Sequence, residues 1–172
     1  ASGAGNQDGS SAANAFAANN LANLQLIFDQ LPDVSLNKTI TIQFEDDAYT
    51  LVGELTVPFD GYELLGNASE FGAATTKSVD MDNAAACDLN ITFPKYGVRS
   101  IIKGIQIRSA NGQTVKYPNL IEGCVVENSA SGVATDYGVY RETGELYAKN
   151  NYFTGGYAAI GAFENCSVVS QI

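Results

Sequence analysis

The sequence predicts an all-β fold in which short parallel strands stack in successive rungs, and three features of one repeated segment predict it. The segment occurs four times, at residues 102–107, 121–126, 148–153 and 163–168. Its third position holds Gly104, Gly123, Asn150 and Asn165. Gly and Asn enter the left-handed backbone region at low cost, so this position predicts a sharp bend in each rung.

The other positions of the segment agree with this register. The fourth position holds Ile, Cys, Asn and Cys, and the sixth position holds Ile, Val, Phe and Val. This spacing of two fits a strand that points alternate side chains inward. Position two alternates Lys and Glu, so parallel stacking brings opposite charges together on the outside. Gly66 and Asp88 extend the bend position upstream, and the bends recur at intervals of roughly 20 residues, which indicates a solenoid.

The chain opens with an extended lead-in and a predicted helix. Residues 1–11 are rich in Gly, Ser, Asn and Asp, which favours turns. Apolar residues then recur at helical spacing over about 12–31, with Ser11 or Asn14 as the expected N-cap and Pro32 as the stop. Within a capping region of residues 12–35, this helix is expected to cover the exposed N-terminal end of the strand stack.

The rungs are expected over residues 36–172. Strands are predicted at 39–44, 49–52, 55–57 and 62–65, followed by a long loop at 67–83, regular rungs from about residue 87, and a large excursion at 132–144. The chain reaches Ile172 soon after a rung. We therefore expect that further rungs follow in the intact protein, or that a partner covers this end.

Composition narrows the function classes. Among 172 residues there are 9 Lys and Arg against 19 Asp and Glu, for a net charge of −10. This balance disfavours nucleic acid and anionic membrane surfaces as partners. The absence of His and of paired cysteine motifs argues against zinc and haem chemistry, so no cofactor is expected, apart from a conceivable Ca²⁺ ion. No apolar run approaches the length of a membrane-spanning helix.

The order of these elements resembles the pectin-lyase-like superfamily of right-handed parallel β-helices. The residues that carry the resemblance are the lead-in Gly5–Phe16, the helical Leu24–Leu31 and the opening strands around Ile40–Tyr49 and Tyr62–Gly66. The resemblance implies a right-handed parallel β-helix with an N-terminal capping helix. Its members include pectate lyases, polygalacturonases, phage tailspikes, surface adhesins and virion decoration proteins, so the fold alone leaves the function open.

The departures from the enzymes of that superfamily favour a non-enzymatic role. The Gly-His-Gly motif of the hydrolases is missing because the chain has no His, and the one adjacent Asp pair, Asp46 and Asp47, lies before the regular rungs. With Glu45 these two residues form the densest acid cluster and the candidate Ca²⁺ site, although a solvated polar turn explains them as well.

The candidate ligand site lies in the excursion at 132–144. Tyr137, Tyr140 and Arg141 are candidates for sugar contact, since a pyranose stacks on Tyr and its hydroxyls bond to polar groups. Asp136 and Glu142 are the candidate catalytic pair, because glycosidases use two carboxyls. Packing of this loop against a neighbouring subunit is the competing interpretation.

We therefore expect a structural or attachment module of a phage virion, as a tail fibre, spike or capsid decoration, or of a bacterial surface. Such a module would be extracellular, would assemble as a trimer or with other virion or surface proteins, and would contact cell-surface glycans. One alternative is the N-terminal part of a polysaccharide lyase or depolymerase of the same fold. Another is a glycan-binding adhesin without catalysis.

Overall fold

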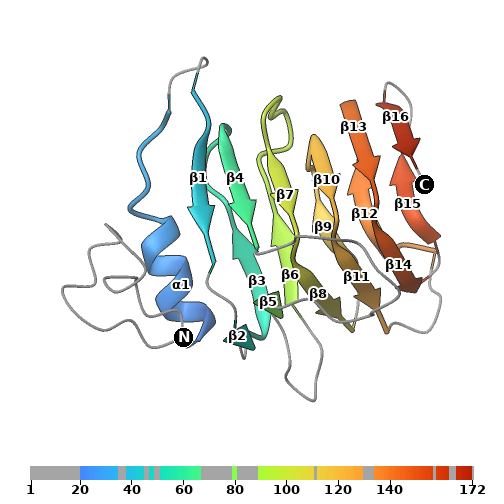
Figure 1. Cartoon of the computed structure of the whole chain (residues 1–172), viewed down its shortest axis with the longest axis horizontal. Coiled ribbons are helices and arrows are strands. Elements are labelled where there is room, and N and C mark those ends of the chain that lie inside the picture. Colours follow the sequence, from blue (N-terminus) through green and yellow to red (C-terminus); the bar gives the residue numbers. More distant parts are fainter. Residues whose placement is uncertain are drawn as a thin grey trace.

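The computed structural model describes residues 20–34, 38–44, 47–48, 51–66, 79–80, 89–110, 112–129, 134–156, 158–162 and 166–171. Within these ranges the chain is all-β apart from one short helix, as the sequence predicts. Every strand pairing is parallel. The strands follow one another along the long axis of the molecule from the blue N-terminal to the red C-terminal end (Figure 1).

The described strands form three sheets. The first sheet has the order β1 (Ile40–Gln43), β4 (Tyr62–Leu65), β7 (Ile101–Lys103), β10 (Leu120–Glu122), β13 (Gly144–Lys149), β16 (Cys166–Gln171). The second has the order β14 (Tyr152–Gly155), β11 (Val125–Asn128), β8 (Gln106–Ser109), β5 (Val79–Asp80), β2 (Asp47–Ala48). The third has the order β15 (Ala158–Ala162), β12 (Tyr137–Arg141), β9 (Gln113–Lys116), β6 (Leu89–Thr92), β3 (Gly53–Thr56). Neighbours are three strands apart in the chain, and we call three successive strands, one from each sheet, a rung.

The predicted bend position lies directly after the first-sheet strands. Lys103 pairs with Glu122, and Glu122 pairs with Lys149, so Gly104, Gly123 and Asn150 follow the strand ends in equivalent places. These three residues have positive φ angles of 65°, 61° and 52°, as predicted. Gly66 takes the equivalent place beside Gly104, because Leu65 pairs with Lys103, but its φ is not positive.

Two of the predicted bend residues, Asp88 and Asn165, lie outside the described residues, but the strands that follow them do not take the predicted places. Gly144 pairs with Cys166 and Lys149 with Gln171, so Cys166 does not take the place of Asn151 that the repeat predicts for it. The strand β6 belongs to the third sheet and pairs with β3 and β9, whereas the strands that follow Gly104 and Gly123 belong to the second sheet. The error arises because a local match to the segment fixes the residue types at a bend but not the sheet to which the next strand belongs.

Columns of apolar side chains from all three sheets meet in the interior. In the third sheet, Leu55, Ile91, Val115 and Val139 pair in register and are fully buried. The first and second sheets contribute equivalent columns: Leu64, Ile102 and Ile121, and Ile107 and Val126. Complete burial of one such side chain stabilises the fold by about 1.5–3 kcal/mol, which makes this core the main source of stability.

The helix α1 (Leu21–Phe28) covers the edge of β3. Leu24 and Phe28 are buried in the core. The Gln25 side chain completes the exposed backbone of β3: its Nε2 donates to Thr56 O at 3.0 Å and its Oε1 accepts from Thr56 N at 2.8 Å. Figure 1 places the helix at the blue end of the row of strands, next to β1.

The boundaries of the helix differ from the prediction. Asn20 is its N-cap, with an extended φ of −155°, and the Asn20 side chain accepts a hydrogen bond from Asn23 N at 2.9 Å. A continuous helix from residue 12 to residue 31 is therefore wrong, while Ser11 and Asn14 lie outside the described residues. No helix in the described part of the chain is long and apolar enough to cross a membrane.

Candidate functional site

The segment that carries the sugar-contact candidates is a strand, and the prediction of a loop there is wrong. Tyr137–Arg141 form β12, which lies between β9 and β15 in the third sheet. The sequence hid this strand because Gly138 and the turn-forming residues on either side interrupt its apolar pattern. The candidates therefore project from a hydrogen-bonded sheet, which holds them more rigidly than a loop does.

Three tyrosine rings meet beside β12. The Tyr140 and Tyr137 rings stack with centroids 5.7 Å apart and planes inclined by 24°. The Tyr140 and Tyr117 ring centroids are 6.0 Å apart with an interplanar angle of 60°. Both are favourable arrangements for aromatic pairs. All three residues are half-buried, so each ring keeps an exposed part.

Gly161 makes room for this stack. Gly161 lies on β15, where it pairs in register with Tyr140 of the neighbouring strand β12. A Cβ atom at this position would lie 2.7 Å from Cγ of the Tyr137 ring, closer than any real side chain allows. The ring of Tyr137 thus packs against the Gly161 backbone and against the Tyr140 ring.

Charged groups lie directly beside the rings. The Tyr140 hydroxyl donates to Glu142 Oε1 at 3.1 Å, and the Lys95 ammonium forms an ion pair with Glu142 Oε2. The bond from Lys95, together with that from Tyr140, holds the pKa of the Glu142 carboxyl below its usual value, so it is ionised at neutral pH. Burial, reinforced by the Glu142 carboxylate, raises the pKa of Tyr140 to about 12.

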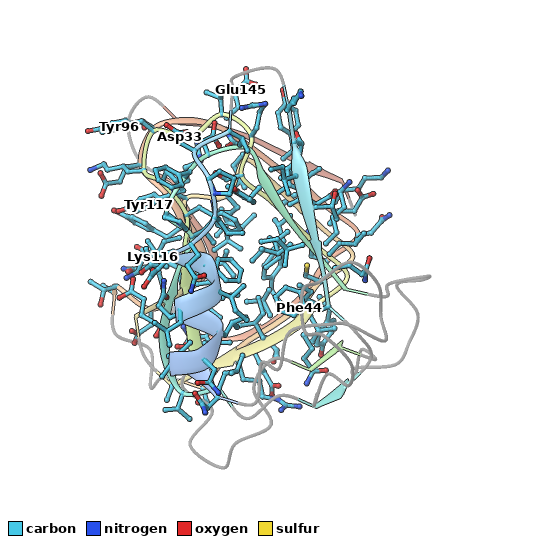
Figure 2. The ribbon with its side chains drawn as sticks, turned by 90° about the vertical axis from the view of Figure 1, so that its left-hand side faces the viewer. Asp33, Phe44, Tyr96, Lys116, Tyr117 and Glu145 are labelled. Atoms are coloured by element: carbon cyan, nitrogen blue, oxygen red, sulfur yellow. The ribbon has the colours of Figure 1, made fainter. Side chains whose placement is uncertain are left out.

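The cluster extends onto the turn after β6. Tyr96 is 77% exposed, and the Lys95 Nζ atom lies 5.8 Å from the centroid of its ring. Figure 2 shows Tyr96 and Tyr117 projecting from the same side of the molecule, away from the core. We call the residues of this cluster the tyrosine face: Lys95, Tyr96, Tyr117, Tyr137, Tyr140 and Glu142.

A second ion pair borders the tyrosine face. Lys116 pairs in register with Tyr140 on the adjacent strand, and its Nζ atom lies 3.3 Å from Glu54 Oε1. The Thr92 hydroxyl also donates to Glu54. Lys116 projects from the same side of the molecule as Tyr117 (Figure 2). The charges of Lys116 and Glu54, which lie next to Tyr140, are thus already paired with each other.

Arg141, predicted to contact a ligand, is buried and bonded to the backbone. It is 1% exposed. Its Nη1 donates to Tyr117 O at 2.7 Å and Pro118 O at 3.0 Å, and its Nη2 donates to Gly97 O at 2.8 Å. The guanidinium therefore joins three successive rungs directly beneath the tyrosine face and fixes the turns that carry Tyr96 and Tyr117.

The candidate catalytic pair is not brought together. Asp136 precedes β12 and Glu142 follows it, so the two carboxyls are separated by the strand, which spans roughly 15–20 Å. A glycosidase holds its two carboxyls about 5–10 Å apart. Asp136 is also buried, and its Oδ1 accepts a hydrogen bond from Gly112 N at 2.8 Å, which gives it a structural role at that corner.

The candidate Ca²⁺ ligands are described only in part. Glu45 and Asp46 lie outside the described residues, and Asp47 belongs to β2, where the backbone alone is described. Within the described ranges, no group of three or more Cys, Asp or Glu side chains is arranged to hold a metal ion.

Sequence reasoning missed Lys95, Tyr96 and Tyr117. These residues follow the third-sheet strands β6 and β9, just as Glu142 follows β12. Residues after equivalent strands in successive rungs come to the same corner, so recognising the third sheet would have grouped them. Comparison with protein-family models, curated proteins and solved structures finds no match, and function is therefore inferred from the tyrosine face itself.

Proposed function

We propose that this chain is a right-handed parallel β-helix of the pectin-lyase-like type that serves as a non-catalytic, glycan-binding attachment module on a virion or cell surface. The assignment of the fold is supported by three parallel sheets in which each strand pairs with the third strand before and after it. Connections between parallel strands of one sheet are right-handed in nearly all proteins, which supports the proposed hand.

The observation that carries the glycan-binding role is the tyrosine face. Tyr96 is 77% exposed and Tyr117, Tyr137 and Tyr140 are half-buried, so the face presents aromatic surface against which the C–H face of a pyranose can pack. Glu142 and Lys95 supply an acceptor and a donor for hydroxyl groups at the edge of the rings. A few fixed polar groups beside aromatic side chains are typical of carbohydrate and small-molecule sites.

The scaffold suits an attachment role because it holds the face without large rearrangement. Tyr137 and Tyr140 stand on β12, which is paired on both sides, and Arg141 ties the turns of Tyr96 and Tyr117 together. On the outer side of the first sheet, ion pairs link the rungs, with Lys103 Nζ 3.0 Å from Glu63 Oε1 and Lys149 Nζ 3.2 Å from Glu122 Oε1. Side chains positioned in advance lose less entropy on binding.

The same geometry disfavours catalysis at this face. A general base must be available to take a proton, yet Tyr140 has a raised pKa and Glu142 a lowered one, and each already bonds to the other. Asp136 is buried at the far end of β12. We therefore place binding ahead of the lyase or depolymerase function.

The test is a glycan array probed with the wild-type protein, Tyr140→Ala and Tyr147→Ala. Tyr147 is a matched control, because its hydroxyl also donates to a glutamate two residues away (Glu145 Oε2 at 2.9 Å) but it lies on the first sheet. We expect Tyr140→Ala to lose binding and Tyr147→Ala to keep it. Release of reducing ends or unsaturated sugars, abolished by Glu142→Gln, would replace this proposal with an enzymatic one.

A further inference from the structure

We infer that the tyrosine face selects neutral, hydroxyl-rich pyranose glycans and discriminates against acidic polysaccharides. This inference rests on the proposed glycan-binding function and specifies its ligand class. It follows from how the charges on and beside the face are already paired, and from the kind of hydrogen-bonding groups left to a ligand.

The cations that a carboxylate sugar would need are engaged by the protein itself. Lys95 is paired with Glu142, and Lys116 lies 3.3 Å (Nζ to Oε1) from Glu54. Arg141 lies beneath the surface, where its guanidinium donates to backbone carbonyls. A uronic acid could bind either ammonium only beside the protein carboxylate that is already paired with it, and the two negative charges would repel each other.

The acceptors on the face match hydroxyl groups. The carboxylates of Glu142 and Glu54 can each accept more hydrogen bonds than their protein partners supply. A pyranose with adjacent hydroxyls can donate two hydrogen bonds to one carboxylate, and bonds to a charged acceptor are the stronger kind. A second carboxylate brought by an acidic sugar would be repelled by these groups.

Two further properties act in the same direction. The rings of Tyr137, Tyr140 and Tyr117 favour the apolar C–H faces of pyranoses, which carry no charge. The whole chain has a net charge of −10, so a polyanionic chain approaches against a repulsive field at low ionic strength. A neutral glycan meets neither penalty.

The experiment measures dissociation constants for two probe sets by isothermal titration calorimetry. The neutral set contains oligosaccharides of mannan, galactan and glucan, and the acidic set contains oligogalacturonate and hyaluronan fragments. The variants are Glu142→Gln and Tyr140→Ala, with Glu145→Gln as the matched control on the first sheet. Circular dichroism establishes that each variant is folded; Glu142 and Glu145 are both on the surface, so their substitutions leave the core intact.

We expect the wild type to bind at least one neutral oligosaccharide and none of the acidic ones. Glu142→Gln should weaken neutral binding about tenfold or more, through loss of a charged acceptor. The same substitution releases Lys95, so binding of the acidic set should become measurable. Glu145→Gln should leave both sets unchanged.

The outcomes separate the two proposals. Acidic oligosaccharides that bind the wild type and lose binding in Tyr140→Ala would overturn the neutral selectivity while leaving the glycan-binding function in place. Neutral binding that is unaffected by Glu142→Gln would overturn the acceptor role assigned to that carboxylate. Binding of neither set, or binding that survives Tyr140→Ala, would overturn the proposed function as well.

Discussion

Gly66 lies against Gly104 in the neighbouring rung so closely that a Cβ atom on Gly66 would stand 2.3 Å from the Gly104 carbonyl oxygen. The two residues occupy equivalent bends, one with positive φ and one without. Gly66 is therefore required by the approach of a neighbouring backbone, whereas Gly104 is favoured by its left-handed conformation. Glycine is thus favoured at this position of the repeat for two different physical reasons.

This relationship predicts the effect of adding one methyl group. Gly66→Ala should lower the free energy of unfolding by about 1–3 kcal/mol, because the rigid backbone of the next rung cannot move aside without disturbing its pairing. Gly112→Ala is the control: a Cβ there meets nothing within 4 Å, and only the positive φ of 62° penalises it, by about 1 kcal/mol. Urea unfolding of both variants measures the difference. A Gly66→Ala variant as stable as wild type would refute the close approach.

Arg141 provides a second prediction. Arg141→Met keeps much of the side-chain volume but removes the donors to Tyr117 O, Pro118 O and Gly97 O, so it should cost about 2–4 kcal/mol of unfolding free energy. Arg141→Lys should recover part of this loss. Lys149→Met, which removes a surface cation paired with Glu122, should cost less than about 1 kcal/mol. Equal losses for Arg141→Met and Lys149→Met in urea unfolding would contradict the buried role of Arg141.

The hydrogen bonds to the Asp60 carboxyl predict that part of the folding stability is lost at acidic pH. Burial alone would raise the pKa of this carboxyl, but hydrogen bonds from Val98 N, Arg99 N and the Ser100 hydroxyl outweigh it and lower the pKa below 3.8. A lowered folded-state pKa contributes stability that is complete above the unfolded-state value and is lost as the pH falls through the folded-state value. Asp60→Asn should therefore be less stable than wild type at neutral pH, and the gap should narrow below about pH 4. Thermal unfolding across this range measures it; a gap that is independent of pH would contradict the account.

The raised pKa of Tyr140 predicts how the protein behaves at alkaline pH. The pKa of about 12, against 10.0 for a free tyrosine, means that the folded state resists ionisation of Tyr140. The associated stability is present below the unfolded-state pKa and is lost as the pH rises toward the folded-state value. In an ultraviolet titration of tyrosinate, Tyr140→Phe should remove one of the last groups to ionise. Glu142→Gln should move that group to lower pH, whereas Glu145→Gln should act on Tyr147 only.

Much of the strand order could be predicted from sequence, because its signals are local. The sequence 102–107 contains a complete bend with one strand on each side, and its matches at 121–126 and 148–153 align in the structure as predicted. The buried Ile105 and Cys124 fill the predicted inward positions. The match at 163–168 does not align, because Cys166 pairs with Gly144, whereas the repeat would place it beside Asn151.

The third sheet could not be predicted in the same way. Its strands β9 and β12 are joined to the preceding strands by connections of unequal length, which a fixed repeat cannot align. The tyrosine face was recognised only through Tyr137, Tyr140 and Glu142, since Lys95 and Tyr117 reach it from other rungs. Arg141 appeared to be a ligand group because charge suggests the surface, whereas three backbone carbonyls stabilise it inside.

The most direct test of the central claim is nuclear magnetic resonance of the protein with isotope-labelled tyrosine rings. The chain has nine tyrosines, of which Tyr147 and Tyr152 are exposed but lie outside the tyrosine face. Titration with a neutral oligosaccharide should shift the signals of Tyr117, Tyr137 and Tyr140 together, with one dissociation constant, and leave Tyr147 and Tyr152 in place. Shifts confined to Tyr147 or Tyr152, or no shift with any glycan, would contradict the claim.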